Sequence, residues 1–406
     1  MHPRKTSLLS LAVLVASLGY FVDIYDLLLF SIIRIKSLSS LGLNADQVRE
    51  VGLQLLDVQM AGLLLGGILW GVLADKKGRL KVLFGSIILY SAANIFNGLV
   101  HGTEAYMVWR FLAGVGLAGE LGAGVTLVSE ILPKEKRGYG TMIISAVGIA
   151  GAVVAGMVAH WFSWRTSFFV GGGLGIVLLL LRLGVLESGM FERSLNSDIR
   201  RGDFLSLFTN RQRLGKYLLC IAIGLPCWYV IGILISFSND FAKALHVRGS
   251  ISPATAVMVS YAALSVGSLA AGSLSQLWQS RRKALTLFLL LTLLGIVLYF
   301  FTWGLSVRAF YAICALLGFG VGYWAIFVTV AAEQFGTNLR GTVATTVPNF
   351  VRGMLVPITL LFQFLEPRLN MLRSGFLTGL LCMAVALTAA LFLQETYHKD
   401  LDYLEI

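Results

Sequence analysis

The sequence predicts an all-α membrane protein with twelve transmembrane helices arranged as two six-helix bundles. Three observations lead to this fold class: an apolar composition, twelve apolar stretches of spanning length, and an internal repeat. Of the 406 residues, 57% are hydrophobic and 13% are charged, and the mean hydropathy is +0.81. Domains that fold in water carry far more charge, so the composition excludes a soluble globular protein.

The apolar stretches recur along the whole chain, with short polar breaks between them. A helix needs about 20 mainly apolar residues to cross the hydrocarbon core of a bilayer, and each stretch comes close to that length. The predicted helices of the first half span residues 8–33, 51–73, 82–100, 106–132, 141–162 and 166–186. Those of the second half span residues 217–237, 254–277, 285–303, 309–335, 342–364 and 376–393.

The distribution of Lys and Arg predicts the orientation of these helices, because cytoplasmic loops carry an excess of both residues. A cytoplasmic N-terminus places about 20 of the 32 Lys and Arg residues on the cytoplasmic side. We therefore expect both termini in the cytoplasm and the chain in a bacterial inner membrane. The net charge of +11 reflects this topology and contact with anionic membrane lipids, not nucleic acid.

Two short motifs occur once in each half of the chain, at nearly the same offset. One has the pattern Gly-x-x-x-Asp-x-x-Gly-Arg and occupies residues 71–79, with a degenerate copy at 272–282. The other is a Glu followed seven residues later by Arg-Gly, found at Glu130 with Arg137 and at Glu333 with Arg340. Two matches at one offset indicate an internal duplication.

This duplication sets the expected domain organisation. The first bundle is predicted at residues 1–191 and the second at 216–406. An Arg-rich cytoplasmic linker with a surface helix is predicted between them, at residues 192–215. The chain is expected to work as a monomer.

The motifs resemble those of the major facilitator superfamily, and the resemblance covers essentially the whole chain. Residues 71–79 look like the signature between its helices 2 and 3, and residues 110–116 look like its helix 4 signature of Arg followed by spaced glycines. Further segments resemble the sugar porter and metabolite:proton symporter branch: Gly119-Glu120, residues 130–138, Trp164-Arg165 and Glu187-Ser188-Gly189. The resemblance implies a secondary transporter that works by alternating access.

The repeated loop motifs are interpreted as a latch that joins the two halves on the cytoplasmic side. Asp75 precedes a helix and is flanked by basic residues, so it can pair with them and with helix-end N–H groups. The resemblance implies that such a latch stabilises the outward-facing state, with the residues Asp75, Arg79, Glu130, Arg137, Glu333 and Arg340. The alternative is a solvated basic loop. Gln276 replaces the acidic residue in the second copy, which puts that half of the latch in doubt.

Ionisable residues inside the predicted spans are the candidates for proton coupling, because a charge in the membrane is costly unless it is paired or lines water. Asp23 and Asp26 share one helix face, and Asp26 reaches a depth similar to that of Arg110. Glu120 lies among glycines that let neighbouring backbones approach. We hypothesise that Glu120 and one of Asp23 or Asp26 bind the coupling proton while Arg110 modulates them.

The alternative is a purely structural Asp–Arg bridge between the first and fourth helices. A further acidic residue, Asp57, lies in the second predicted helix and receives no role.

Arg352 is the candidate for substrate binding in the second half. It follows Pro348 and Asn349 near the middle of a predicted helix, and a guanidinium is well suited to bind a carboxylate or phosphate. Aromatic residues at similar depth are candidate walls of the site, although aromatics also serve packing: Tyr25, Trp228, Tyr229, Tyr323 and Trp324. Together with Asn349, they predict a site for a small, anionic substrate.

The sequence therefore predicts a proton-coupled symporter of a small organic anion or related metabolite. An exporter or antiporter of a drug, siderophore or metabolite is the first alternative, and a non-transporting receptor on the same scaffold is the second. The helix at 141–162 lacks the Gly-Pro motif of drug antiporters, which favours symport. No nucleophile constellation, cofactor motif or metal cluster is evident, so we expect no enzyme activity and no cofactor besides the proton as coupling ion.

Overall fold

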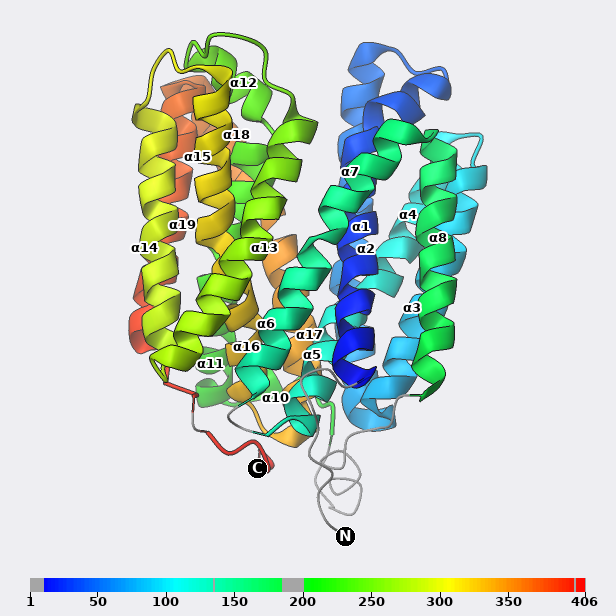
Figure 1. Cartoon of the computed structure of the whole chain (residues 1–406), viewed down its shortest axis with the longest axis vertical. Coiled ribbons are helices and arrows are strands. Elements are labelled where there is room, and N and C mark those ends of the chain that lie inside the picture. Colours follow the sequence, from blue (N-terminus) through cyan, green and yellow to red (C-terminus); the bar gives the residue numbers. More distant parts are fainter. Residues whose placement is uncertain (1–10, 134–135, 185–200, 398, 406) are drawn as a thin grey trace.

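The computed structural model describes residues 11–133, 136–184, 201–397 and 399–405. Within them, twelve helical runs are long and apolar enough to cross a membrane (Figure 1). This number confirms the twelve predicted spans. The predicted residues 8–10 of the first span and Glu187-Ser188-Gly189 lie outside the described residues.

The first six spans are built from eight helices. Two spans are broken within the membrane, the fourth after Leu117 and the fifth after Ile149. The helices are α1 (Leu11–Ser40), α2 (Ala45–Lys77), α3 (Arg79–Leu99), α4 (Thr103–Leu117), α5 (Glu120–Ile131), α6 (Arg137–Ile149), α7 (Gly151–Trp161) and α8 (Trp164–Leu181). The turn η1 (Arg182–Gly184) follows.

The second six spans follow the short helix α10 (Ser206–Thr209), which lies within the predicted linker. They comprise α11 (Arg211–Tyr229), η2 (Val230–Ile235), α12 (Ser238–Ala244), α13 (Pro253–Leu277), α14 (Arg281–Phe301), α15 (Val307–Gly320), η3 (Val321–Tyr323), α16 (Trp324–Glu333), α17 (Thr337–Gly353), α18 (Leu355–Leu369) and α19 (Met371–Phe392). The wide helical turn η2 follows Pro226, whose ring removes a backbone donor.

Several helices begin at polar residues that hydropathy does not detect. Asn44 forms a capping box with Gln47, and the side chains of Ser163, Asn210 and Ser280 each accept a hydrogen bond from the first turn of the following helix. These caps satisfy backbone N–H groups that have no partner within the helix. They explain why α2 and α11 start several residues before the predicted spans.

The two sets of helices form two bundles that come together toward the end where Leu11 and Glu405 lie, which we call the termini end (Figure 1). Close backbone approach makes this contact possible. A Cβ atom at Gly122 of α5 would collide with the backbone of Thr345 of α17, and one at Gly71 of α2 would lie 3.0 Å from the backbone of Thr342.

The outer surface of the bundles is apolar. Large hydrophobic side chains that are about half exposed or more occur on helices of both halves, among them Leu65, Ile88, Leu180, Leu294 and Leu360. An apolar surface of this extent is unfavourable in contact with water, whereas lipid chains solvate it well. The chain is an integral membrane protein.

Candidate functional site

An ion pair joins the first half of the chain to the second. Arg352 of α17 donates from Nη2 to Oδ2 of Asp23 on α1 at 3.1 Å, and both side chains are fully buried. Arg352 Nη1 also donates to Oδ1 of Asn349 at 3.2 Å. The amide of Asn349 donates in turn to the carbonyl of Ala118 at 3.0 Å, where α4 ends. Two residues assigned to the substrate site thus contact the first half directly.

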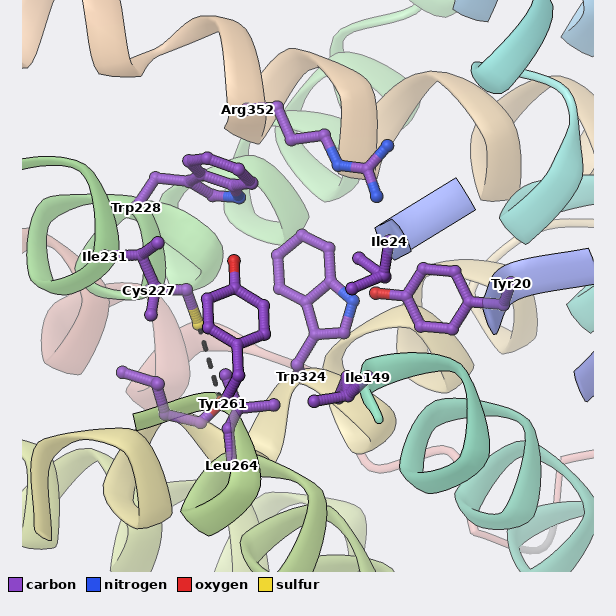
Figure 2. Close-up of a pocket in the computed structure, with 11 residues that line it drawn as sticks. Tyr20, Ile24, Ile149, Cys227, Trp228, Ile231, Tyr261, Leu264, Trp324 and Arg352 are labelled. Carbon is purple, nitrogen blue, oxygen red and sulfur yellow. Dashed lines mark hydrogen bonds between the residues drawn. The ribbon is translucent and has the colours of Figure 1, made fainter. Parts of the chain in front are cut away.

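A narrow cavity lies beside this ion pair. Its lining side chains come from both halves of the chain: Tyr20, Ile24, Ile149, Cys227, Trp228, Ile231, Tyr261, Leu264, Val321, Trp324 and Arg352. Figure 2 shows the hydroxyl of Tyr20 pointing toward the indole of Trp324, with the Arg352 guanidinium nearby. The free space amounts to about 30 Å³, room for about two water molecules. The cavity combines one cation with aromatic and aliphatic walls.

Asp26 and Arg110 form a second buried ion pair, at 3.3 Å between Oδ1 and Nη1. Arg110 Nη2 also donates to the Gln59 side chain, and its guanidinium lies over the rings of Phe30 and Phe168. The expected pairing of Asp26 with Arg110 is therefore present. All these residues belong to the first half, and none lines the cavity.

Glu120 has a different partner from the one that the sequence suggested. Its carboxylate accepts hydrogen bonds from Nη1 of Arg182 at 3.1 Å, from Nη2 of Arg182, and from the hydroxyl of Ser86 at 2.5 Å. Arg182 follows α8 and is fully buried. The sequence contained a signal for this pair, namely a second Arg inside a predicted span of the same half, but it did not reveal the contact.

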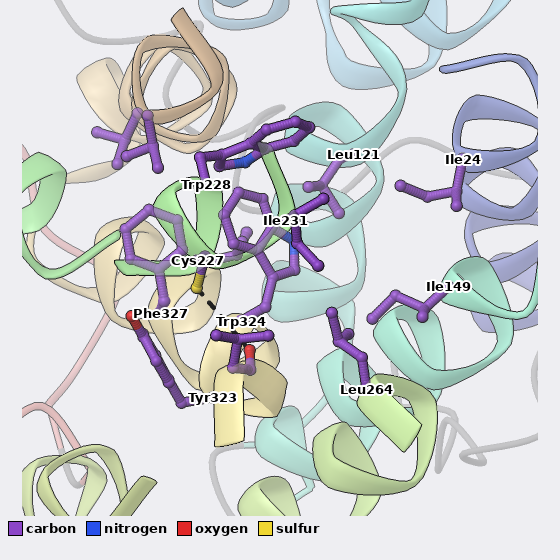
Figure 3. Packing of buried hydrophobic residues seen from close by; sticks show 14 of the residues in the cluster. Ile24, Leu121, Ile149, Cys227, Trp228, Ile231, Leu264, Tyr323, Trp324 and Phe327 are labelled. Atoms are coloured by element: carbon purple, nitrogen blue, oxygen red, sulfur yellow. Dashed lines mark hydrogen bonds between the residues drawn. The ribbon is translucent and has the colours of Figure 1, made fainter. Parts of the chain in front are cut away.

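The predicted aromatic residues divide into two groups. Trp228 and Trp324 line the cavity. The hydroxyls of Tyr25, Tyr229 and Tyr323 instead donate to backbone carbonyls of Ser167, Gly375 and Ile223 at 2.8, 2.6 and 2.9 Å. Figure 3 shows Tyr323 packed behind Trp324, on the far side from Ile24 and Ile149. These three tyrosines fasten helices to each other and are not among the lining residues.

The latch residues of the first half contact the second half at the termini end. The Asp75 carboxylate accepts hydrogen bonds from the N–H groups of Gly341 and Thr342, at 2.9 and 2.7 Å, and from the Thr342 hydroxyl at 2.7 Å. Glu130 pairs with Arg79 at 2.8 Å and with Arg340 at 3.1 Å. One carboxylate thus binds the second turn of α17, while another bridges arginines of both halves.

The second half repeats part of this geometry. Arg281 pairs with Glu333 at 3.1 Å, as Arg79 does with Glu130. Gln276 occupies the place that corresponds to Asp75: its amide oxygen, in the orientation that satisfies both amide atoms, lies 3.0 Å from the N–H of Gly138. A neutral amide therefore replaces the charged carboxylate. Arg137 Nε donates to the carbonyl of Leu132 at 3.3 Å.

Residues 9–353 match the family model of the Major Facilitator Superfamily. The chain belongs to this superfamily. Its membership makes the protein a transporter rather than an enzyme, and it agrees with the twelve spans.

Named relatives of this major facilitator are transporters of small metabolites. A Bacillus subtilis protein named for niacin and nicotinamide transport is 25% identical over 402 residues, which cover 96% of each chain. A Cupriavidus pinatubonensis protein named for 4-methylmuconolactone transport is 26% identical, over 80% of this chain and 76% of that one. The gentisate transporter of Corynebacterium glutamicum is 24% identical, over 95% and 88%.

The fold of this major facilitator is also that of a solved structure. The proton:xylose symporter XylE superposes with a TM-score of 0.74 at 16% sequence identity, over 97% of each chain. The arrangement of the two bundles is therefore the superfamily's own.

Proposed function

We propose that this chain is a proton-coupled symporter of a small organic anion and works by alternating access. One observation carries the proposal: a buried arginine of the second half, Arg352, lines a cavity between the halves and is paired there with a carboxylate of the first half. A cation at such a place binds an anion. A carboxylate at the same place can exchange a proton with water when the cavity opens to either side.

The chemistry of the cavity favours a single-ring aromatic carboxylate. The Arg352 guanidinium presents a planar fork that matches a carboxylate. The rings of Tyr20, Tyr261 and Trp324 and the side chain of Ile24 offer faces on which a flat ring can pack. Two relatives are named for the transport of niacin and gentisate, which are compounds of this kind. The second predicted substrate residue, Asn349, holds Arg352 in position.

The latch supports an assignment of the conformation. Asp75, Glu130 and Arg340 hold the halves together at the termini end, where the positive-inside rule places the cytoplasm. In this reading the structure is closed toward the cytoplasm of a bacterial cell, and the anion enters from the outside. Opening toward the cytoplasm breaks the contacts of Asp75 with α17 and of Glu130 with Arg340.

Uptake by reconstituted vesicles tests the proposal. Purified protein is placed in liposomes, and radiolabelled benzoate, nicotinate and gentisate are supplied outside at a lower pH than inside. We expect at least one of the three to accumulate, and we expect a protonophore to abolish the accumulation.

Variants make the test specific to the site. Arg352→Ala should lower the affinity for the transported anion by about tenfold or more, since it removes a charge-assisted hydrogen bond. Asp57→Asn is the matched control, because Asp57 is exposed and lies outside the cavity. Normal transport of a carboxylate by Arg352→Ala would refute the substrate site. Anion loss driven by proton entry would indicate the antiporter instead.

A further inference from the structure

We propose that Arg352 is shared between Asp23 and the substrate, so that the carboxylate of the incoming anion displaces Asp23 from the guanidinium and Asp23 takes up the coupling proton. The inference rests on the proposed function and narrows it. It selects Asp23 among the three candidate proton carriers Asp23, Asp26 and Glu120, and it fixes one proton per substrate carboxylate.

The buried ion pairs of the three candidate proton carriers, Asp23, Asp26 and Glu120, differ in where they lie. Asp26–Arg110 and Glu120–Arg182 are each formed within the first half. Asp23–Arg352 alone among the three joins one half to the other, and Arg352 alone of the three arginines lines the cavity. An anion in the cavity can therefore compete for Arg352, whereas Arg110 and Arg182 keep their carboxylates.

The three carboxylates also differ in how firmly their charge is held. Among the described residues, Glu120 accepts hydrogen bonds from two groups of Arg182 and from Ser86, and both oxygens of Asp26 accept from Arg110. Asp23 accepts one hydrogen bond, through Oδ2, and its Oδ1 has no hydrogen-bond partner within the described part of the chain. Loss of a single contact leaves Asp23 without support for its charge.

Among the described residues that act electrostatically on Asp23, Arg352 is the one cation. The ionisable side chains that act on it or respond to it come from five elements: Arg352 on α17, Glu120 on α5, Tyr90 on α3, Tyr261 on α13, and Tyr20 and Asp26 on its own helix α1. A charged carboxylate in this setting, once separated from Arg352, would face two other carboxylates without a counter-ion. Such a buried, uncompensated charge is strongly unfavourable, so Asp23 is neutralised by a proton.

The exchange balances in charge and in atoms. Before binding, Arg352 carries one positive charge and Asp23 one negative charge. Afterwards the substrate carboxylate pairs with Arg352, and one O–H bond has formed on Asp23 with a proton from the outer solution. The cavity has gained one anion and one proton, so the transport of a monocarboxylate is electroneutral.

The same exchange explains how substrate binding leads to movement of the two halves. The Asp23–Arg352 pair is a direct link between α1 and α17, beside a cavity with room for about two waters. A ring can enter only if the walls part, and breaking the pair removes one of the links that hold them. After release of anion and proton on the other side the pair re-forms, which returns the empty carrier.

The variant Asp23→Asn separates substrate binding from proton coupling. Vesicles are loaded with unlabelled benzoate, nicotinate or gentisate, whichever the wild type takes up, and exchange with labelled anion outside is followed first. We expect Asp23→Asn to keep this exchange, because Arg352 stays available to the carboxylate. Exchange faster than in protein-free vesicles, which measure passive diffusion of the protonated acid, also shows that the variant is folded.

Accumulation against a gradient is then compared. For an inward proton gradient of one pH unit, one-to-one coupling concentrates the anion about tenfold in the wild type and in the control Asp57→Asn. Asp23→Asn should equilibrate the anion without concentrating it. Accumulation retained by Asp23→Asn would overturn the inference while leaving the proposed function intact. Loss of exchange in a folded variant would overturn the idea that the substrate carboxylate displaces Asp23 from Arg352. If the wild type accumulates none of the three anions, the proposed function itself fails.

A second measurement needs no variant. Binding of the transported anion to the detergent-solubilised wild type in weak buffer should take up one proton per anion bound, read with a pH indicator at a pH where the free anion is fully ionised. Binding without proton uptake would overturn the inference.

Discussion

At the scale of single residues, the Glu120–Arg182 pair shows which features of a site can be predicted from sequence and which cannot. The sequence predicted a buried carboxylate at position 120, because an acidic residue among glycines in a span must find a partner or water. It did not predict Arg182, which is 62 residues away and lies at the end of its helix, where cations usually mark a membrane boundary. Pairing between helices depends on their relative rotation and depth, which hydropathy does not contain.

Removal of one partner of this pair should destabilise the protein. Glu120→Gln leaves the buried Arg182 guanidinium without a counter-charge, at a cost of about 3–5 kcal/mol, and the melting temperature of the detergent-purified protein should fall clearly. The double variant Glu120→Gln with Arg182→Met should recover part of the loss, because it buries no unpaired charge. Equal melting temperatures for Glu120→Gln and wild type would contradict a structural ion pair.

Glu395 provides a pH-dependent contribution to stability outside the membrane spans. Burial raises the pKa of its carboxyl, but hydrogen bonds from the Ser280 hydroxyl and from the N–H groups of Arg281, Arg282 and Tyr397 outweigh burial and hold the pKa below the usual 4.5. A carboxyl with a lowered folded-state pKa stabilises the fold above pH 4.5, and this contribution is lost as the pH falls through the folded value.

Glu395→Gln should therefore lower the melting temperature at neutral pH, and the difference from wild type should shrink as the pH drops below 4.5. Thermal unfolding of both proteins across a pH series measures this. A difference that stays constant at all pH values would show that the charge of Glu395 is not what stabilises the start of α14.

At the scale of elements, α17 shows where hydropathy fails. The sequence placed the start of this helix at residue 342, because Thr337, Asn338 and Arg340 are polar. The helix begins at Thr337, and these residues are buried against the first half and the C-terminal segment rather than exposed to water. Asp75 accepts hydrogen bonds from the second turn of the helix, at Gly341 and Thr342. A polar helix end that forms an interface looks like a loop when only local hydropathy is considered.

The contact between α5 and α17 depends on the absence of a side chain at Gly122. A larger residue there would collide with the backbone of Thr345, which cannot move without shifting α17. We expect Gly122→Val to prevent closure of the termini end and to reduce anion uptake by about tenfold or more. Gly173→Ala in α8 is the control, because nothing lies within 4 Å of its added Cβ atom. Unchanged uptake by Gly122→Val would refute a tight approach during transport.

At the scale of the whole molecule, the two halves resemble each other in geometry but differ in charge. The sequence predicted the duplicated motifs and the latch, because both are patterns within short segments. It also identified Asp23 and Arg352, but it assigned them to separate tasks, one for protons and one for the anion. Their contact spans 329 residues and arises only when the bundles meet.

The latch predicts a shift of conformation in Asp75→Asn. The change removes a negative charge that accepts three hydrogen bonds from α17, and a hydrogen bond to a charged group contributes about 1.5 kcal/mol or more. Spin labels at Lys77→Cys and Gln279→Cys, both exposed at the termini end, report the distance between the halves. The four native cysteines are buried, so they compete little for the label. We expect a larger population of long distances in Asp75→Asn than in wild type or Asp57→Asn. Identical distance distributions would mean that Asp75 does not hold the halves together.

We infer that anion movement and proton movement are one event. Both fluxes can be measured in the same vesicles, with labelled benzoate, nicotinate or gentisate outside and a pH-sensitive dye trapped inside. We predict that the lumen acidifies as the anion enters, in a ratio of one proton to one monocarboxylate, and that an imposed membrane potential leaves the rate unchanged. Entry of the anion without acidification of the lumen would contradict the account.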